Sequence, residues 1–388
     1  MAVGVEWSGH FHAGEVTGRE VSSVNMGRVL SRLIAPVWQP TAKSLRGWAL
    51  AAVISNAIII SSGAAVRLSS SGLGCPDWPT CTQTDASAIA AHAVGQTTLN
   101  TWIEFGNRLI TFPVAAIAGL TFIAGLRYYL AHGRTRRDLL WLSAFLPLGI
   151  IAQAIVGGLV TLSKLNPAMV AAHFLLSTAI ILTAAVVLHA RTRVLADAAA
   201  GLPVPPPARI DLRLLTGLLT AVTAVMLAAG TVVTGTGPLA GTEIDKNGHL
   251  TTVPRFHFPL ESVTQLHADI GWFIAALAVA LVIGLRFAGG SPRTVRLGWI
   301  VLAGLGAQGV IGYAQYFNHL PAGLVWVHVS CAVTIWIFVL QLFLSTGTGL
   351  PRPTRPSAPG DEQAADGPVA GDPFVDAGPV SDAAKPLR

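Results

Sequence analysis

Long apolar stretches alternate with short polar segments along most of the chain. Each stretch reaches the length of about 20 residues that an α-helix needs to cross the hydrocarbon core of a bilayer, and few charged residues interrupt it. The pattern therefore predicts an all-α integral membrane protein with eight transmembrane helices. The predicted helices lie at about residues 48–66, 106–126, 139–161, 170–190, 214–234, 264–285, 297–316 and 323–345.

The two halves of the chain resemble each other. Gln153 and Gln308 each precede a histidine by twenty residues, His173 and His328, and the short turn between them predicts a helical hairpin in each half. Each half then holds four helices, and an even number of spans gives both halves the same orientation in the membrane. The sequence thus predicts two pseudo-symmetric four-helix bundles.

The repeat divides the chain into five segments. The first bundle is expected at 46–192 and the second at 213–346, joined by a cytoplasmic linker at 193–212. Residues 1–45 have no apolar core of a signal peptide and are expected to form a flexible cytoplasmic segment. Residues 347–388 are rich in Pro, Gly, Ala and Asp, which predicts a disordered cytoplasmic tail.

The charge of the chain agrees with a membrane protein. Only 11% of the 388 residues are charged, whereas soluble domains carry about 25%. The net charge of +6 would indicate a nucleic-acid partner in a soluble protein, but here the basic residues fall in short loops and form no basic stripe interleaved with aromatic residues. We therefore expect membrane lipid, and no nucleic acid, around the protein.

The basic residues also predict the orientation of the helices. They gather in the loops after the second, fourth and sixth helices, and cytoplasmic loops carry an excess of Lys and Arg. Both termini are therefore expected in the cytoplasm of a multi-pass cell-membrane protein, with the loop at 68–103 outside. The residues in question are Arg127, Arg134, Arg136, Arg137, Arg191, Arg193, Arg209, Arg213, Arg286, Arg293 and Arg296.

Ionisable residues inside spanning helices are expensive to bury and indicate function. His267 and His328 fall on two helices of the second half, near the ends predicted to lie outside. Two imidazoles on facing helices of one bundle suit the axial ligation of a haem iron. Zinc is disfavoured because the surroundings are apolar. The alternative is that both histidines are hydrogen-bonded packing residues.

The first half differs at one of the two ligand positions. Asn107 stands where the second half has His267, so His173 is the single strong iron ligand expected there. An open face on the iron suits substrate chemistry better than electron transfer. Glu104, one turn from Asn107, is suited to stabilising a cationic intermediate or to moving protons. Its alternative role is a carboxylate favoured by the dipole at a helix N-terminus.

The remaining candidates lie in or near the predicted outer loops. Arg67 and Arg108 suit haem propionates, although snorkelling arginines are common at this depth. Cys75 and Cys81, in the stretch GLGCPDWPTC, lie in an oxidising setting, which favours a disulfide over two free thiols. That disulfide is either a redox element or a structural staple, and both readings stay open.

These residues resemble the haem A synthase family. The resemblance rests on SSGAAVRLSSSGLGCPDWPTC, on EFGNRL, on the QAIVGG segment that leads to His173, and on QLHADIGW and VWVHVSCA in the second half. It covers about residues 46–345, and GLGCPDWPTC is its most specific part. It implies a membrane oxidoreductase that oxidises a ring methyl of haem O to a formyl group, giving haem A for cytochrome oxidase.

The resemblance also implies cofactor, substrate and partners. The family's haem b maps onto His267 and His328, and its substrate site for haem O maps onto His173 and Glu104. A haem O synthase is the expected source of the substrate, and the electron donor is unidentified. A homo-oligomer is compatible with the sequence.

One departure from the family pattern keeps an alternative function open. Family members commonly carry a histidine where this chain has Asn107, so two-histidine ligation of the substrate haem is unsupported here. A membrane cytochrome b that only transfers electrons is the alternative, and it would keep two axial histidines in both halves. A haem-handling transporter without redox chemistry is a third reading, favoured only by the internal repeat.

Overall fold

The computed structural model describes residues 34–75, 77–81, 98–244 and 250–347. Within these ranges, eight helical spans are long and apolar enough to cross a membrane. The eight predicted helices are therefore confirmed, and each begins earlier and ends later than its apolar stretch. The extensions arise because a helix continues past the hydrocarbon core until a cap or turn satisfies its terminal groups.

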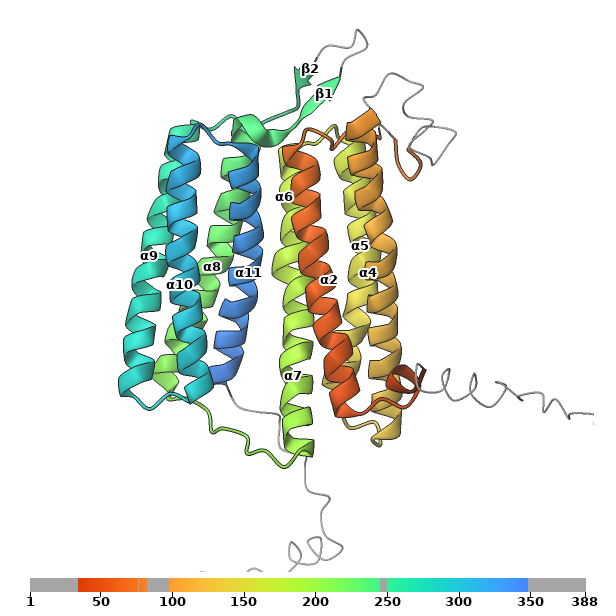
Figure 1. Ribbon diagram of the computed structural model, residues 1–388, viewed down its shortest axis with the longest axis vertical. Coiled ribbons are helices and arrows are strands. Elements are labelled where there is room, and N and C mark those ends of the chain that lie inside the picture. Colours follow the sequence, from red (N-terminus) through yellow and green to blue (C-terminus); the bar gives the residue numbers. More distant parts are fainter. Residues whose placement is uncertain (1–33, 76, 82–97, 245–249, 348–388) are drawn as a thin grey trace, which may run out of the picture. The chain divides into compact units, whose positions relative to one another are not determined.

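The elements follow one another from α2 to α11 (Figure 1). A π-helix, η1, interrupts the fourth span, so that α6, η1 and α7 form one span from Pro167 to Ala199. The bounds are α2 (Ala42–Leu68), α4 (Thr98–Ala131), α5 (Arg137–Leu162), α6 (Pro167–Leu175), η1 (Leu176–Leu182), α7 (Thr183–Ala199), α8 (Ile210–Thr236), η2 (Pro238–Ala240), β1 (Thr242–Ile244), β2 (Leu250–Thr252), α9 (Leu260–Phe287), α10 (Pro292–Phe317) and α11 (Ala322–Thr346).

The first four spans pack against one another, and so do the last four (Figure 1). In the first group α2 contacts α4 and α7, and α4 contacts α5. In the second group α8 contacts α9, α9 contacts α10, and α10 contacts α11. The groups meet through α11, which contacts α2 and α7, and through α6, which contacts α8. The helices that carry His173 and His328 therefore both lie where the two groups join.

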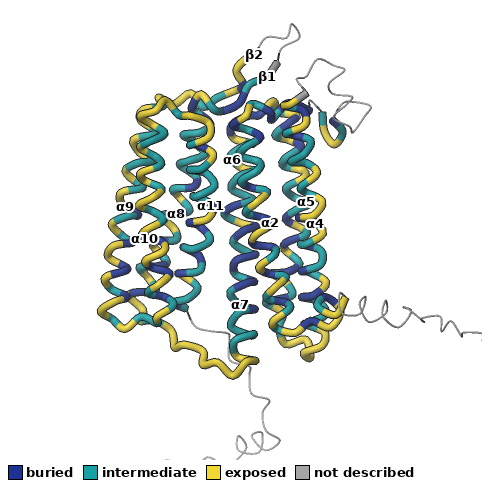
Figure 2. The backbone as a smooth tube through the Cα atoms, viewed as in Figure 1, coloured by how far each residue is buried: buried dark blue, intermediate teal, exposed yellow. Residues whose placement is uncertain are grey.

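Exposed and buried residues alternate along the helices (Figure 2), and many of the exposed residues are large and apolar. Phe112, Trp141 and Val310 are 71%, 69% and 71% exposed, whereas Leu146 and Leu281 are completely buried. Apolar surface on this scale is unusual for a soluble monomer, but it is expected where lipid is the solvent. The exposure pattern and the eight spans together indicate a multi-pass membrane protein.

The two predicted helical hairpins have matching turns. Lys164 and Leu165 both adopt positive φ, as do His319 and Leu320. In each turn the second of these residues donates its N–H to a carbonyl five positions earlier, Leu165 to Val160 and Leu320 to Gln315. This bond is the six-to-one closure of a Schellman motif, which satisfies an otherwise free carbonyl at the helix end.

The π-helix η1 begins three residues after His173. It leaves backbone carbonyls without their ordinary α-helical partners. One of them, that of Thr178, accepts a hydrogen bond from the indole N–H of Trp336 at 3.0 Å. Trp336 also donates to the hydroxyl of Thr183 at 3.1 Å. Because Trp336 belongs to α11, these bonds join the helices that carry His173 and His328.

The connection between α8 and α9 contains two short paired strands. β1 and β2 pair antiparallel, with Thr242 opposite Thr252. Beside them, Ala240 and Val253 pack with Leu73 and Leu165 of the first half in a small buried cluster. The connecting loops of both halves therefore share one apolar contact at the end of the helices nearest the disulfide loop.

Parts of the predicted terminal segments fall outside the described residues. Of the segment 1–45, the structure describes residues from 34 onward, where residues 34–38 are helical and α2 begins at Ala42. The predicted tail lies outside the described residues from 348 onward. The first seven residues of the predicted linker at 193–212 belong to α7, which ends at Ala199.

Candidate functional site

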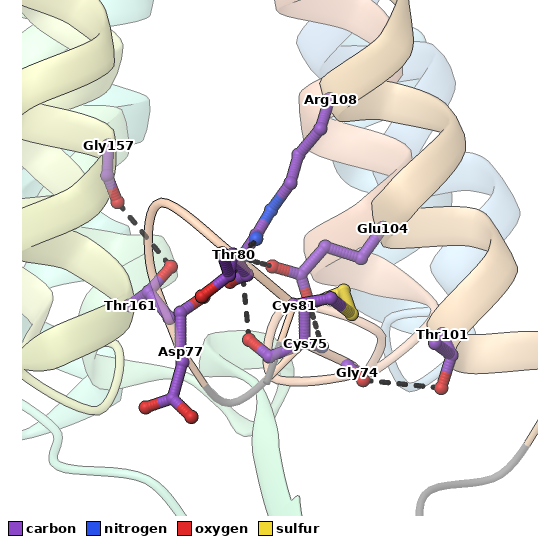
Figure 3. Close-up of polar contacts among 10 residues, drawn as sticks. All are labelled: Gly74, Cys75, Asp77, Thr80, Cys81, Thr101, Glu104, Arg108, Gly157 and Thr161. Carbon is purple, nitrogen blue, oxygen red and sulfur yellow. Dashed lines mark hydrogen bonds and ion pairs between the residues drawn. A yellow bond between two sulfur atoms is a disulfide. The ribbon is translucent and has the colours of Figure 1, made fainter. Parts of the chain in front are cut away.

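The stretch Gly72–Cys81 folds back over the start of α4 as a disulfide-closed loop. Cys75 and Cys81 are bonded and both are almost completely buried. The backbone N–H of Cys75 donates to the Glu104 carboxylate at 2.8 Å, and the Thr101 hydroxyl donates to the Gly74 carbonyl at 3.2 Å (Figure 3). The predicted disulfide is therefore present, and α4 holds the loop through Glu104.

Arg108 holds the other side of the same loop. Its guanidinium forms an ion pair with Glu104 at 2.8 Å (Figure 3). It also donates to the backbone carbonyls of Asp77 and Thr80 at 3.2 Å, and to that of Cys75 at 3.4 Å. The planar guanidinium has five N–H donors, so a single side chain can bind several carbonyls at once. Glu104 and Arg108 together form a clasp for the disulfide loop.

The position of Glu104 in α4 excludes one of the two roles considered for it. α4 begins at Thr98, so Glu104 is its seventh residue and lies beyond the first turn. The helix-dipole explanation is therefore wrong, because that effect fades within one turn. Glu104 is 7% exposed, and its two oxygens accept from Cys75 and Arg108. Glu104 lies next to the disulfide loop, and its role in moving protons stays a prediction.

Trp78, at the tip of the loop, lies against α5. A Cβ atom added to Gly158 would come within 2.6 Å of the Trp78 ring, closer than real atoms approach. Glycine is therefore required at this position for the indole to lie flat on the helix. The loop is thus held by α4 on one side and by α5 on the other.

We expect Gly158→Ala to loosen the disulfide loop, since the new methyl group must displace Trp78. The expected result is a faster reaction of Cys75–Cys81 with a mild reductant, followed by thiol labelling, and a lower melting temperature. Gly119→Ala is the matched control, because a Cβ there has no atom within 4 Å. Equal reduction rates in the two variants would contradict the packing of Trp78 on α5.

The predicted histidines of the two hairpins have equivalent surroundings. The side-chain amide of Gln153 donates to the backbone carbonyl of His173 at 3.0 Å, and that of Gln308 to His328 at 2.8 Å. A Cβ on Gly157 would lie 3.1 Å from the His173 ring, and one on Gly312 would lie 3.3 Å from the His328 ring. The twenty-residue spacing seen in the sequence therefore reflects the same local structure in both halves.

His267 and His328 face each other in the second half. Their ring centres are 6.4 Å apart. Two imidazoles that hold one metal between them have ring centres about 6 Å apart, because each metal–nitrogen bond is about 2 Å long. Gly230 leaves room beside His267, since a Cβ there would lie 3.3 Å from the ring. The pair therefore has the spacing required for two axial ligands of one iron.

All three candidate ligands leave a buried nitrogen unsatisfied. The Nδ1 atoms of His173, His267 and His328 are buried without a hydrogen-bond partner. A buried polar atom without a partner is unfavourable and calls for an explanation. The Cε1–Nδ1 edge of each ring packs against a glycine of a neighbouring helix, so an iron bound through Nε2 would leave Nδ1 without a partner. The fit to haem therefore rests on the spacing of His267 and His328.

Asn107 occupies in the first half the place of His267. Its amide oxygen accepts a hydrogen bond from the Ser62 hydroxyl at 2.6 Å. A Cβ on Gly63 would lie 3.9 Å from the amide nitrogen of Asn107, so that Gly63 lies beside Asn107 as Gly230 lies beside His267. Among the described residues, no hydrogen bond or ion pair joins His173 to Glu104 or Asn107. The first half thus presents one imidazole and one amide where the second presents two imidazoles.

The two arginines predicted near haem propionates are held by backbone carbonyls. Arg108 belongs to the clasp. Arg67 donates to the carbonyls of Ala240 and Thr234 in the second half, each at 3.3 Å. Propionate binding by either arginine stays a prediction, and Arg67 has a structural role in joining the two halves.

Sequence reasoning missed some residues around the site. The histidine-facing glycines Gly157 and Gly312 lie four residues after the matched glutamines, so the repeat itself held the signal for them. Trp78 and Ser62 carried no such signal, because their contacts depend on which helix the loop and α2 meet. Cys331 is the free cysteine of the described residues and is partly buried.

The fold and site define an integral membrane protein with eight spans and buried imidazoles suited to haem. Residues 46–340 match the family model of COX15-CtaA, described as cytochrome oxidase assembly protein. The chain therefore belongs to this family of cytochrome oxidase assembly proteins.

Curated relatives agree with this family. The chain is 27% identical over 367 residues to a protein named Heme A synthase from Methylorubrum extorquens strain PA1, covering 83% of this chain and 92% of the relative. It is 28% identical over 347 residues to the Heme A synthase of a second strain of that organism, covering 78% and 87%. A Heme A synthase from Geobacillus kaustophilus is 30% identical over 123 residues, covering 31% and 34%.

Proposed function

We propose that this protein is a haem A synthase, which oxidises a ring methyl of haem O to a formyl group and so provides haem A for cytochrome oxidase. The observation that carries the proposal is the difference between the two halves. The second half has two facing imidazoles, His267 and His328, whereas the first has one histidine, His173 on α6, and an amide, Asn107 on α4, at the position that matches His267. One filled site and one open site suit an electron relay and a substrate site.

The second half would hold a haem b cofactor through His267 and His328. Haem b supplies one-electron transfer when it is bound. The residues of the chain orient the two imidazoles: Gln308 fixes the backbone at His328, and Gly230 and Gly312 keep the space beside the rings clear. The apolar interior excludes water around both rings.

The first half would bind haem O with His173 as its protein ligand. Replacing two methyl hydrogens by one oxygen removes four electrons from the substrate, so an external redox partner is required, and that partner is unidentified. Glu104 and Arg108 keep the disulfide loop on α4. We infer that this loop covers the substrate side and that Glu104 is the acid–base group nearest to it.

The placement in the cell is also part of the proposal. Arginines gather at the helix ends opposite the disulfide loop, which favours a cytoplasmic location for those ends and for both termini. The disulfide favours an oxidising compartment for the other end. The haem sites would then lie toward the outer side of the cell membrane, with haem O supplied by a haem O synthase.

Expression in a host that makes haem O but lacks haem A tests the proposal. We expect extracted pigment to contain haem A when the wild-type protein is present. His173→Ala should form no haem A, because the open site loses its iron ligand, yet it should keep the haem b absorption of the second half. A folded wild-type protein that retains haem b and forms no haem A would instead be a membrane cytochrome b that acts only in electron transfer.

A further inference from the structure

Three arginines converge at the helix ends opposite the disulfide loop. Arg46 lies in the first turns of α2, Arg193 near the end of α7, and Arg293 at the start of α10. We call these three residues the arginine cluster. Two of its members belong to the first half and one to the second; Arg46 and Arg193 share Asp197, and Arg293 is close enough for its charge to interact with all three.

The cluster holds more positive charge than its acidic partner balances. Arg46 and Arg193 share one carboxylate, Asp197, at 3.4 and 3.5 Å. Arg293 donates to the neutral amide of Gln341 at 3.4 Å. Charge-assisted bonds of full strength are shorter, about 2.7–2.9 Å. Among the described residues, two guanidinium groups thus share one carboxylate through long contacts and the third contacts an amide, so that two of the three positive charges have no acidic partner.

Several donors in the cluster are buried and unpaired. The Nε atoms of Arg193 and Arg293 are buried without a hydrogen-bond partner. The same holds for Nδ1 of His189, a neighbouring residue that is only 9% exposed. The side chain of Arg193 is 18% exposed. An arginine that snorkels toward water keeps its N–H donors in solvent, whereas the Nε atoms of Arg193 and Arg293 are buried.

We propose that the arginine cluster binds the phosphate headgroup of an anionic phospholipid. Phosphate oxygens accept from guanidinium forks and would supply both the missing negative charge and the missing acceptors. The cluster lies at helix ends, the depth at which headgroups meet a membrane protein, and basic pockets between helices on that side bind such headgroups. The acyl chains would lie along the apolar outer surfaces of the helices. This site is independent of the proposed haem chemistry.

Inorganic phosphate shares the chemistry of the headgroup, so the experiment compares the two. The full-length protein in detergent is given phosphatidylglycerol, phosphatidylcholine or inorganic phosphate at equal concentration, and its melting temperature and bound lipid (by native mass spectrometry) are measured. We expect phosphatidylglycerol alone to raise the melting temperature and to stay bound.

Variants locate the effect. Arg193→Gln and Arg293→Gln should each weaken phosphatidylglycerol binding by about fivefold, the effect of one charge near a membrane surface. Arg137→Gln removes a charge at the same end of the helices from an exposed side chain, and it should bind lipid like the wild type. Arg293→Lys keeps the charge and should retain part of the binding, provided that all variants elute as single species.

Two results would overturn the proposal. Equal stabilisation of wild type, Arg193→Gln and Arg293→Gln by phosphatidylglycerol would show that the lipid does not use the cluster. Stabilisation by inorganic phosphate equal to that by phosphatidylglycerol would assign the cluster to a free anion in place of a lipid. Neither result depends on whether the protein makes haem A.

Discussion

His328→Ala is expected to abolish the haem b spectrum of the purified protein, and His267→Ala to do the same. Each change removes one of two imidazoles whose ring centres are 6.4 Å apart, and a haem held from one face only in this bundle should be lost during purification. The measurement is the reduced-minus-oxidised absorption spectrum together with pyridine haemochrome analysis of the protein after size-exclusion chromatography.

His257→Ala is the matched control for both variants. His257 precedes α9 and is exposed, so its loss should leave the haem content unchanged. Haem content in His328→Ala and His267→Ala equal to that of the control would remove the assignment of the second-half site. It would leave the family membership of the chain untouched.

Arg108→Gln is expected to reduce haem A formation by about two orders of magnitude. The change removes one partner of a largely buried ion pair, which costs about 3 kcal/mol, and it also removes donors to three loop carbonyls. Since about 1.4 kcal/mol corresponds to a factor of ten, the equilibrium between the closed and the open loop would shift toward the open loop by about two orders of magnitude. Haem A is measured by extraction from the haem-O-producing host, and loop opening by limited proteolysis.

Two comparisons make the Arg108 prediction specific. Arg255→Gln, which removes a single bond to the carbonyl of Pro238, should keep wild-type activity and wild-type proteolysis. Glu104→Gln keeps the shape of the clasp and can still accept from Cys75. If Glu104 only holds the loop, Glu104→Gln should be far more active than Arg108→Gln. If it also moves protons, both variants should be inactive while only Arg108→Gln is cleaved faster.

The sequence predicted the spans well, because a run of about 20 apolar residues is recognisable without any knowledge of helix packing. It also predicted the pairing of Gln153 with His173 and of Gln308 with His328, since equal spacing in two hairpins produces equal geometry. The disulfide of Cys75 and Cys81 was predicted because the expected topology places both residues outside, in an oxidising compartment. These features depend on residues close together in the chain, or on repetition.

Features that depend on distant segments could not be predicted in this way. Glu104 had to be seen beneath Cys75, 29 positions earlier, before its role in the clasp was evident. The arginine cluster joins residues of α2, α7 and α10, and in the sequence its members are indistinguishable from the other arginines near the ends of the spans. Helix ends were underestimated because polar residues extend each helix beyond its apolar core.

The π-helix after His173 has a consequence for how two like halves diverge. A π turn accommodates one extra residue within a helix, and α11 has no such turn among its residues after His328. The two spans therefore share the turn and the histidine and differ in helical phase beyond them. The residues that follow His173 then present other faces to their bundle than the residues that follow His328. Two bundles with like histidine positions can in this way have different inner faces.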